Sequence, residues 1–302
     1  MPTTTTKARP APKRKPVRGG SSRPAGLFTW ITIGVIVAVI IAILVVKAVS
    51  SQTETFVPTS PAIAAELTNV PASVFNAVGV TSPDISITGP LSITGQKPLN
   101  WKLDGKVLPT VYYYGAEFCP YCAAERWPMI IALSRFGTFT GLGNMESNPT
   151  DIDGNTPTFT LVRATYTSQY INFFHVEAET RYHKNLQTPT AAELANITKY
   201  DTDQWDPALP KDGTGNGSIP YVSFNNRFFI IGASYNPQAL AGLSRSQIAS
   251  LLDQPSDPLT KGIIVTANLI TASVCNIDGQ MPTAVCTSPG VRAADSSMRL
   301  KA

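Results

Sequence analysis

The stretch VLPTVYYYGAEFCPYCAAERWPMIIALSRFG, residues 107–137, decides the fold of this chain. Its first part, up to Gly115, is rich in β-branched and aromatic residues and predicts a buried strand. From Cys119 onward the apolar residues follow helical spacing, and Gly137 is expected to stop that helix. Pro128 predicts a kink within it, because proline removes one backbone hydrogen bond. A strand that runs directly into a helix indicates an α/β arrangement.

Two cysteines lie at this junction, in the motif Cys119-Pro120-Tyr121-Cys122. With Cys119 at the helix N-cap, free backbone N–H groups and the helix dipole would stabilise its thiolate. Cys122 lies one turn further on and is expected to be more buried. We therefore expect Cys119 to exchange with a substrate and Cys122 to resolve the mixed disulfide. Pro120 suits the first helical position, which needs no N–H, and Tyr121 is the spacer that would help to set the reduction potential.

Other interpretations of the motif stay open. A zinc site would need a second close ligand pair, but ten residues separate Cys275 from Cys286, so no metal is expected. A structural disulfide suits an exported protein. The strand-to-helix context favours redox chemistry, which uses the thiols themselves and needs no cofactor. For Cys275 and Cys286 we expect a structural disulfide, with a second redox pair as the alternative.

Composition narrows the class of protein. Of the 302 residues 43% are hydrophobic and only 15% are charged, against roughly 25% charged in an average soluble domain. The hydrophobic fraction excludes disorder for the bulk of the chain. The low charged fraction is typical of membrane or exported proteins. His175 and His183 are the two histidines, which excludes a site built on several imidazoles.

The N-terminal region predicts a membrane anchor. Residues 1–26 carry seven Lys and Arg and no acid, as a disordered basic tail would, and residues 27–46 carry no charge. A helix of about 20 residues spans the ~30 Å of a bilayer core, so we expect a transmembrane helix over residues 27–49. The excess of Lys and Arg before it predicts a cytoplasmic N-terminus and an extracytoplasmic remainder. A cleaved signal peptide is the alternative, although its apolar core is usually about 7–15 residues long.

The overall charge of +4 hides an uneven distribution. Residues 51–302 carry 16 Lys and Arg against 20 Asp and Glu, a net charge of −4. A basic face that binds nucleic acid is therefore not expected. The expected partners are instead the lipid bilayer, the thiols and disulfides of exported proteins, and a redox partner in the membrane or envelope.

Beyond the helix we expect a stalk, residues 50–60, and one extracytoplasmic domain, residues 61–302, with one mixed sheet. Two short helices are predicted within residues 61–80, broken by Pro71, and further helices near 191–197, 244–252 and 258–275. Short strands are predicted over residues 85–93, 158–164 and 170–176, with a loop over 141–157 and a hairpin around Asn225-Asn226. Residues 177–217 read as an insertion.

The segment VYYYGAEFCPYCAAERWPMIIALSRF, residues 111–136, resembles thioredoxin-fold oxidoreductases, especially the exported disulfide-bond group. The resemblance implies an α/β fold with a thioredoxin-like mixed sheet, here with a helical insertion. It also implies that Ile219-Pro220-Tyr221 is the cis-proline loop facing the active disulfide. Pro220 would then be cis, and the Ile219 backbone would bind a substrate peptide.

The sequence departs from the thioredoxin pattern at one position. Tyr113 stands where thioredoxins have a buried acid, six residues before the first cysteine, which favours an oxidase or isomerase over a reductase. Glu117 is expected at the surface, and Glu125 is placed near Cys122.

The external portion as a whole also resembles the domain-of-unknown-function family 929, a label that names no substrate. Three segments carry this resemblance: YGAEFCPYCAAERW (residues 114–127), VSFNNRFFIIGASYNP (residues 222–237) and ANLITASVCNIDGQMPTAVC (residues 267–286).

Together these observations predict a membrane-anchored extracytoplasmic thiol–disulfide oxidoreductase. The alternative is a non-catalytic envelope module with two structural disulfides. Accessibility of Cys119 distinguishes the two, since exchange requires an exposed sulfur. The expected catalytic residues are Cys119, Cys122 and Pro220, and the expected substrate-binding residues are Pro120, Tyr121 and Ile219.

Overall fold

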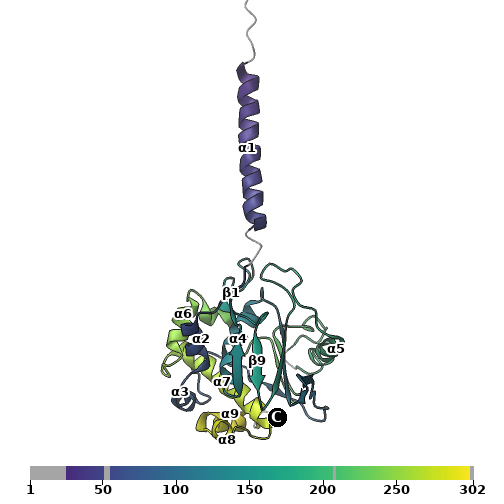
Figure 1. Cartoon of the computed structure of the whole chain (residues 1–302), viewed down its shortest axis with the longest axis vertical. Coiled ribbons are helices and arrows are strands. Elements are labelled where there is room, and N and C mark those ends of the chain that lie inside the picture. Colours follow the sequence, from purple (N-terminus) through teal and green to yellow (C-terminus); the bar gives the residue numbers. More distant parts are fainter. Residues whose placement is uncertain (1–24, 51–54, 207–208, 300–302) are drawn as a thin grey trace, which may run out of the picture. The chain divides into compact units, whose positions relative to one another are not determined.

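The computed structural model describes residues 25–50, 55–206 and 209–299 (Figure 1). The chain divides into two compact units, Met1–Thr53 and Glu54–Ala302. Most of the predicted tail, residues 1–26, and part of the predicted stalk, residues 50–60, lie outside the described residues.

The first unit contains helix α1 (Ala25–Ser50), which covers the range predicted to cross the membrane. Its described large apolar side chains are all exposed, by between 45% at Ile33 and 73% at Trp30. Among the residues whose side chains the structure describes, α7 (Pro258–Ile277) is long and apolar enough for a membrane span, and α1 contributes the shorter apolar stretch Ile33–Leu44. Because 89% of its apolar stretch is buried inside the protein, α7 is a core helix.

The second unit is built on a five-stranded mixed sheet. Its order is β10-β5-β11-β12-β2, and β5 pairs in parallel with β10 and antiparallel with β11. The bounds are Leu91–Ser92 (β2), Thr110–Gly115 (β5), Asn172–Glu177 (β10), Tyr221–Phe224 (β11) and Phe228–Ile231 (β12). This agrees with the expected α/β class and mixed sheet.

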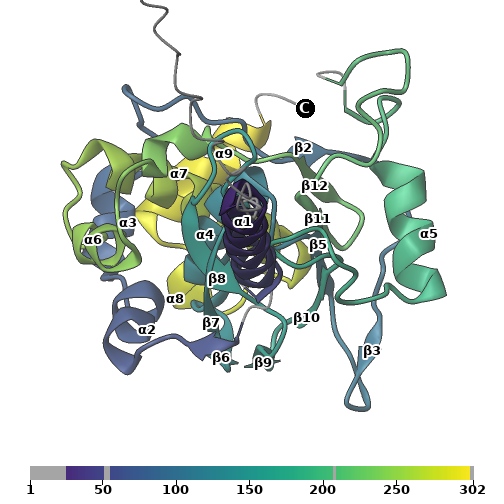
Figure 2. The same ribbon diagram turned by 90° about the horizontal axis from the view of Figure 1, so that it is seen from above.

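The two faces of this sheet bury different clusters. Val111 and Tyr113 of β5 belong to the larger core, together with α4 (Pro120–Leu133) and α7. Tyr112 points to the opposite face, since successive strand residues alternate, and packs there with residues of α5 (Ala191–Tyr200). The strands accordingly lie between α4 and α7 on one side and α5 on the other (Figure 2).

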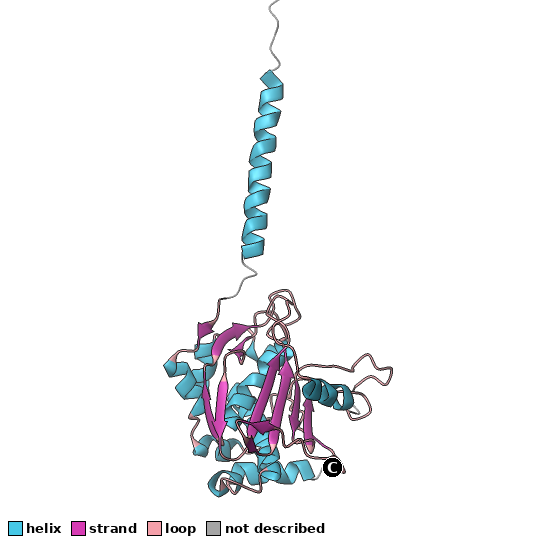
Figure 3. Ribbon diagram, turned by 45° about the vertical axis from the view of Figure 1, so that its right-hand side comes forward, coloured by secondary structure: helices cyan, strands magenta, loops and turns pink. Residues whose placement is uncertain are grey.

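Smaller elements surround this frame (Figure 3). Three further sheets join β1-β7-β8, β3-β4 and β6-β9, so the expectation of a single sheet was too simple for the described residues. Their bounds are Val57–Pro58 (β1), Lys102–Leu103 (β3), Lys106–Val107 (β4), Gly137–Thr140 (β6), Gly143–Glu146 (β7), Pro157–Thr160 (β8) and Thr165–Ser168 (β9). The remaining helices are Pro61–Thr68 (α2), Ala72–Val78 (α3), Pro237–Leu240 (η1, a 3₁₀ helix), Arg245–Leu251 (α6), Thr283–Cys286 (α8) and Pro289–Arg299 (α9).

Several predicted boundaries were wrong. Gly137 does not stop the helix, which ends at Leu133, but starts β6. The predicted loop over residues 141–157 contains β7, and residues 85–93 form a strand only at β2. The outcome followed from which residues find a pairing partner: β6 pairs with β9, β7 with β8, and of residues 85–93 only Leu91 and Ser92 pair, with β12. Local sequence does not encode such pairing. The predicted hairpin is present, and Asn225 and Asn226 both have positive φ, as a tight two-residue turn requires.

Candidate active site

Cys119 is the N-cap of α4, as expected from the sequence. The backbone N–H of Cys122 donates to Sγ of Cys119 at 3.2 Å, which satisfies one of the free N–H groups of the first helical turn. Pro120 occupies the start of the helix, where no N–H is needed. The pair therefore stands where β5 gives way to α4, with both cysteines as free thiols.

A second segment, a hundred residues further along the chain, completes the site. The Ile219–Pro220 peptide bond is cis, as the thioredoxin resemblance implies. Sγ of Cys119 lies 3.7 Å from the carbonyl oxygen of Ile219, to which the thiol donates. Pairing of β11 with β5 brings these segments together, because Tyr221 lies opposite Tyr114 near the ends of both strands.

The two thiols have different environments. The side-chain hydrogen bond of Cys122 lowers the pKa of Cys119 and, with the backbone N–H of Cys122 and the charge of Arg126, outweighs the effect of burial. Burial raises the pKa of Cys122 well above its ordinary value. Of the two, Cys119 is thus the thiol that more readily forms a thiolate, which is the asymmetry expected from the sequence.

Exposure of the motif differs from expectation. Cys119 is only 4% exposed, and Cys122 is fully buried. Pro120 is also buried, whereas Tyr121 is 39% exposed and Ile219 half-buried. Of the residues predicted to contact substrate, Tyr121 and Ile219 are therefore the accessible ones.

One buried charged residue near the motif was predicted wrongly from the sequence, and an ion pair there was not predicted. Glu117, expected at the surface, is buried and accepts a hydrogen bond from Thr160 of β8. Arg126 of α4 is fully buried and forms a two-pronged ion pair with Glu177 of β10, with Nε–Oε1 at 2.9 Å. The i, i+4 spacing of Cys122 and Arg126 was a signal of this arrangement, because it places both on one helix face.

Gly115, the last residue of β5, has no room for a side chain. A Cβ at this position would lie 2.2 Å from the hydroxyl of Tyr113 and 3.0 Å from Sγ of Cys122. Tyr113, six residues before Cys119, therefore has its hydroxyl beside the cysteine pair. Its ring also lies beneath the guanidinium of Arg126, 5.8 Å from the ring centroid.

The model of a family described as a domain of unknown function, DUF929, matches residues 96–276. The chain belongs to this family. No curated protein and no solved structure matches the chain. The DUF929 region contains both halves of the site, Cys119-Pro120-Tyr121-Cys122 and Ile219-Pro220, whereas α1 lies outside it.

The two parts of the predicted insertion, residues 177–217, pack in different places. Its first part packs beside the motif, where the backbone N–H of Glu117 donates to the carbonyl of Glu179 at 2.9 Å. The ring of His183 packs against Phe118 at a tilt of 35° with centroids 4.0 Å apart, and its nitrogens lie 3.8 Å and 3.5 Å from the carboxylates of Asp151 and Glu179. The second part, α5, covers the opposite sheet face.

The second cysteine pair of the chain is a disulfide. Cys275 at the end of α7 is bonded to Cys286 of α8, with 5.6 Å between the Cα atoms, and both residues are buried. The bond was predicted, although Cys286 lies ten residues beyond the DUF929 match. Among the described residues, no cluster of three His, Cys, Asp or Glu is arranged to hold a metal ion.

Proposed function

We propose that the protein is a membrane-anchored extracytoplasmic thiol–disulfide oxidoreductase that acts on exported proteins as an oxidase or isomerase. The observation that carries this proposal is the asymmetric pair: Cys119 caps α4 with its pKa lowered, and Cys122 lies buried behind it with its pKa raised. In such an arrangement Cys119 is suited to attack a disulfide and to leave from a mixed disulfide, and Cys122 is suited to resolve the mixed disulfide.

In the oxidase direction the pair starts as a disulfide. A substrate thiolate attacks Sγ of Cys119, the bond to Cys122 breaks, and Cys122 leaves as a thiolate that takes up a proton. A second substrate thiolate attacks the substrate sulfur of this mixed disulfide, so that a substrate disulfide forms and Cys119 leaves as a thiolate. Two electrons pass from substrate to the pair, and an envelope partner that carries a disulfide removes them.

In the isomerase direction the thiolate of Cys119 attacks a substrate disulfide, and a different substrate thiol later displaces it. No net electrons move in this cycle. The cis Ile219–Pro220 segment supports both directions, since its carbonyl lies against Sγ of Cys119, at the point where a substrate chain would approach. A strand–helix unit followed by an antiparallel hairpin in one mixed sheet also supports a thioredoxin-like fold.

Helix α1 supports the membrane anchor. Its 26 residues would extend ~39 Å at ~1.5 Å per residue, which is enough for a bilayer core of ~30 Å. The apolar side chains described in α1 are exposed and have no partner in water, whereas a bilayer would cover them.

A second candidate function rests on a specific observation. With only 4% of Cys119 exposed, the motif also suits a non-catalytic envelope module in which the pair forms a structural disulfide. The two functions predict different reduction potentials.

The test is the reduction potential of the Cys119–Cys122 couple in the full chain, in mild detergent. Equilibration in glutathione buffers followed by alkylation and mass spectrometry reads this pair separately from Cys275–Cys286. A potential of about −120 to −200 mV supports the oxidase or isomerase. A potential more negative than about −300 mV would identify a structural bond and overturn the proposal.

Trapping of substrates gives an independent measurement. With Cys122→Ser the mixed disulfide on Cys119 cannot be resolved, so covalent adducts with exported proteins should accumulate. The matched control is Cys286→Ser, which frees a cysteine outside the motif and should trap none of the same proteins.

A further inference from the structure

Arg126 has one hydrogen-bonding group left over in a fully buried position. Nε and Nη2 bind Glu177, and Nη2 also donates to the carbonyl of Ala116 at 2.8 Å. Nη1 has no hydrogen-bond partner among the described residues. A buried guanidinium with a free N–H group is costly, so its position calls for an explanation beyond stability.

The carbonyl of Ala116 links this cation to the reactive cysteine. It accepts hydrogen bonds from Nη2 of Arg126 at 2.8 Å and from the backbone N–H of Cys119 at 3.3 Å. On the same helix face, Arg126 lies one turn beyond Cys122. Through this carbonyl the buried guanidinium is linked to Cys119 at the N-cap of α4, and it lies one helical turn from Cys122 in the sequence of the helix.

We propose that Arg126, held in place by Glu177, is the positioning residue that stabilises the Cys119 thiolate and so favours the reduced form of the pair. This inference rests on the proposed oxidoreductase function and names the residue that tunes it. Reduction of the Cys119–Cys122 disulfide by a substrate dithiol leaves a thiolate on Cys119, and a fixed positive charge favours that state.

The ionisable groups around Arg126 come from three elements: Cys119 and Cys122 of α4, Tyr113 of β5, and Glu177 of β10. Burial raises the pKa of Tyr113 well above its ordinary value, so this group stays neutral. The positive charge of Arg126 opposes the effect of burial at both thiols. Arg126 is thus a fixed cation, with Glu177 as its counterion on the neighbouring strand.

The test compares four variants of the full chain in mild detergent: Arg126→Met, Arg126→Lys, Glu177→Gln and Arg135→Met. Mass spectrometry of alkylated peptides gives the potential of the pair, and the pH dependence of Cys119 alkylation gives its thiolate fraction. Arg135 is the matched control, because its guanidinium lies over Phe75 and near Thr271.

We expect Arg126→Met to lower the thiolate fraction about tenfold and to make the potential more negative by about 30 mV, the equivalent for a two-electron couple. Glu177→Gln should move both quantities in the opposite direction, since it leaves the cation without its counterion. Arg126→Lys should retain most of the effect, and Arg135→Met should change neither quantity.

If Arg126 has a purely structural role, Arg126→Met and Glu177→Gln should shift the thiolate fraction and the potential in the same direction or leave both unchanged. That result would overturn the inference. If Arg126→Met does not fold, the double variant Arg126→Met/Glu177→Gln is used in its place, because it leaves no unpaired buried charge. Its thiolate fraction and potential should change in the direction expected for Arg126→Met. Neither readout needs a protein substrate. Failure of substrate trapping would therefore count against the proposed function alone, and unchanged potentials against this inference alone.

Discussion

At the scale of single residues, Glu125 is an acid buried in the helix that carries the cysteine pair. The backbone N–H of Ser234 donates to its Oε2 at 2.8 Å. Burial raises the pKa of Glu125 to about 7, and the bond from Ser234 opposes this rise. An unfolded chain ionises this group near 4.5, so between the two values the folded state holds the additional proton. The stabilisation is complete at low pH and is lost as the pH rises toward 7.

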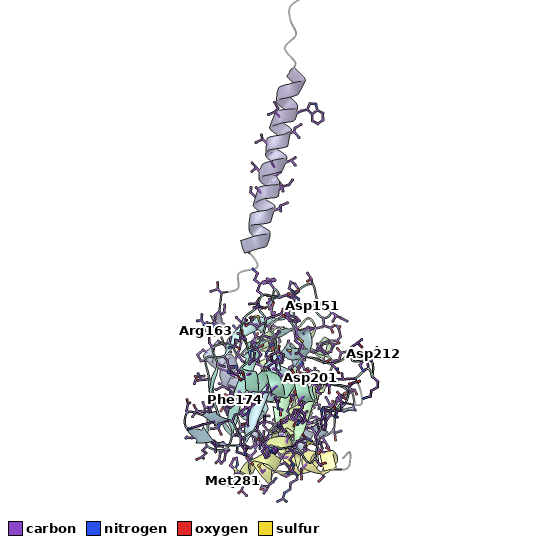
Figure 4. The ribbon with its side chains drawn as sticks, turned by 90° about the vertical axis from the view of Figure 1, so that its right-hand side faces the viewer. Asp151, Arg163, Phe174, Asp201, Asp212 and Met281 are labelled. Carbon is purple, nitrogen blue, oxygen red and sulfur yellow. A yellow bond between two sulfur atoms is a disulfide. The ribbon has the colours of Figure 1, made fainter. Side chains whose placement is uncertain are left out.

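We therefore predict that Glu125→Gln flattens the pH dependence of stability. Between pH 4.5 and 7 the free energy of unfolding of the native chain should fall by about 3 kcal/mol through this group, and the variant should lack that fall. Chemical unfolding across pH 4–8 measures the difference. Asp201 at the end of α5 (Figure 4), whose pKa burial also raises to about 7, contributes a separate fall that Asp201→Asn removes. An unchanged slope in Glu125→Gln would show that this carboxyl is ionised in the folded chain.

Gly115 gives a steric prediction at the same scale. Since a Cβ there would meet the hydroxyl of Tyr113 at 2.2 Å, Gly115→Ala should lower the free energy of unfolding by about 1–3 kcal/mol. The matched control is Gly89→Ala, whose nearest neighbour would be Cδ1 of Leu269 at an ordinary 3.6 Å. Guanidinium unfolding of both variants should show a change within about 0.5 kcal/mol for the control. Equal destabilisation of the two would rule out the crowded site as the cause.

At the scale of elements, the Cys275–Cys286 bond ties the end of α7 to α8. It closes a loop with a sequence separation of 11, so its removal should lower the free energy of unfolding by about 3 kcal/mol through the entropy of the unfolded chain. Thermal unfolding of Cys275→Ala/Cys286→Ala measures this loss. The rate of Cys119 alkylation should not change, because α7 and α8 do not supply residues to the motif. A changed rate would support the alternative of a second redox pair.

Elements that local sequence defines could be predicted, whereas elements defined by pairing with another strand could not. The strand β5 and the helix α4 could be predicted because a long apolar run, an N-cap and a proline at the first position agree with one another. The strands β6 and β9 are short and largely polar, and their mutual pairing alone defines them. Helix α9 was missed, although Val291, Ala294 and Met298 are buried at helical spacing.

The candidate site likewise has parts that local sequence predicts and parts that depend on strand pairing. Spacing and a strand-to-helix junction were sufficient to predict the placement of Cys119 and Cys122. The cis bond before Pro220 came from the resemblance alone. The pairing of Arg126 with Glu177 depends on the parallel contact of β10 with β5, which joins residues 51 apart in the sequence. Because sequence spacing does not determine which strands become neighbours, this charge could not be assigned a partner.

At the scale of the whole molecule, the uneven distribution of charge and apolar residues predicts where the protein is held. Residues 1–26 carry seven positive charges, residues 51–302 have a net charge of −4, and α1 lies between them. A bilayer would stabilise such an order, since it would cover the apolar helix, and the excess of Lys and Arg predicts that the basic flank lies on the cytoplasmic side. The second unit has a hydrophobic core of its own.

We predict that the full chain stays with membranes after an alkaline carbonate wash and that Ile40→Asp releases it. Ile40 is half exposed in the central part of α1, where an aspartate costs about 2.5–3.5 kcal/mol for insertion into a bilayer. Val57→Asp is the matched control, because Val57 is also an exposed apolar residue but lies in β1 of the second unit. Immunoblots of the pellet and supernatant should find the control with the membranes and Ile40→Asp largely in solution. Release of the native chain by carbonate alone would show that α1 does not span the bilayer, and the extracytoplasmic placement of Cys119 would fall with it.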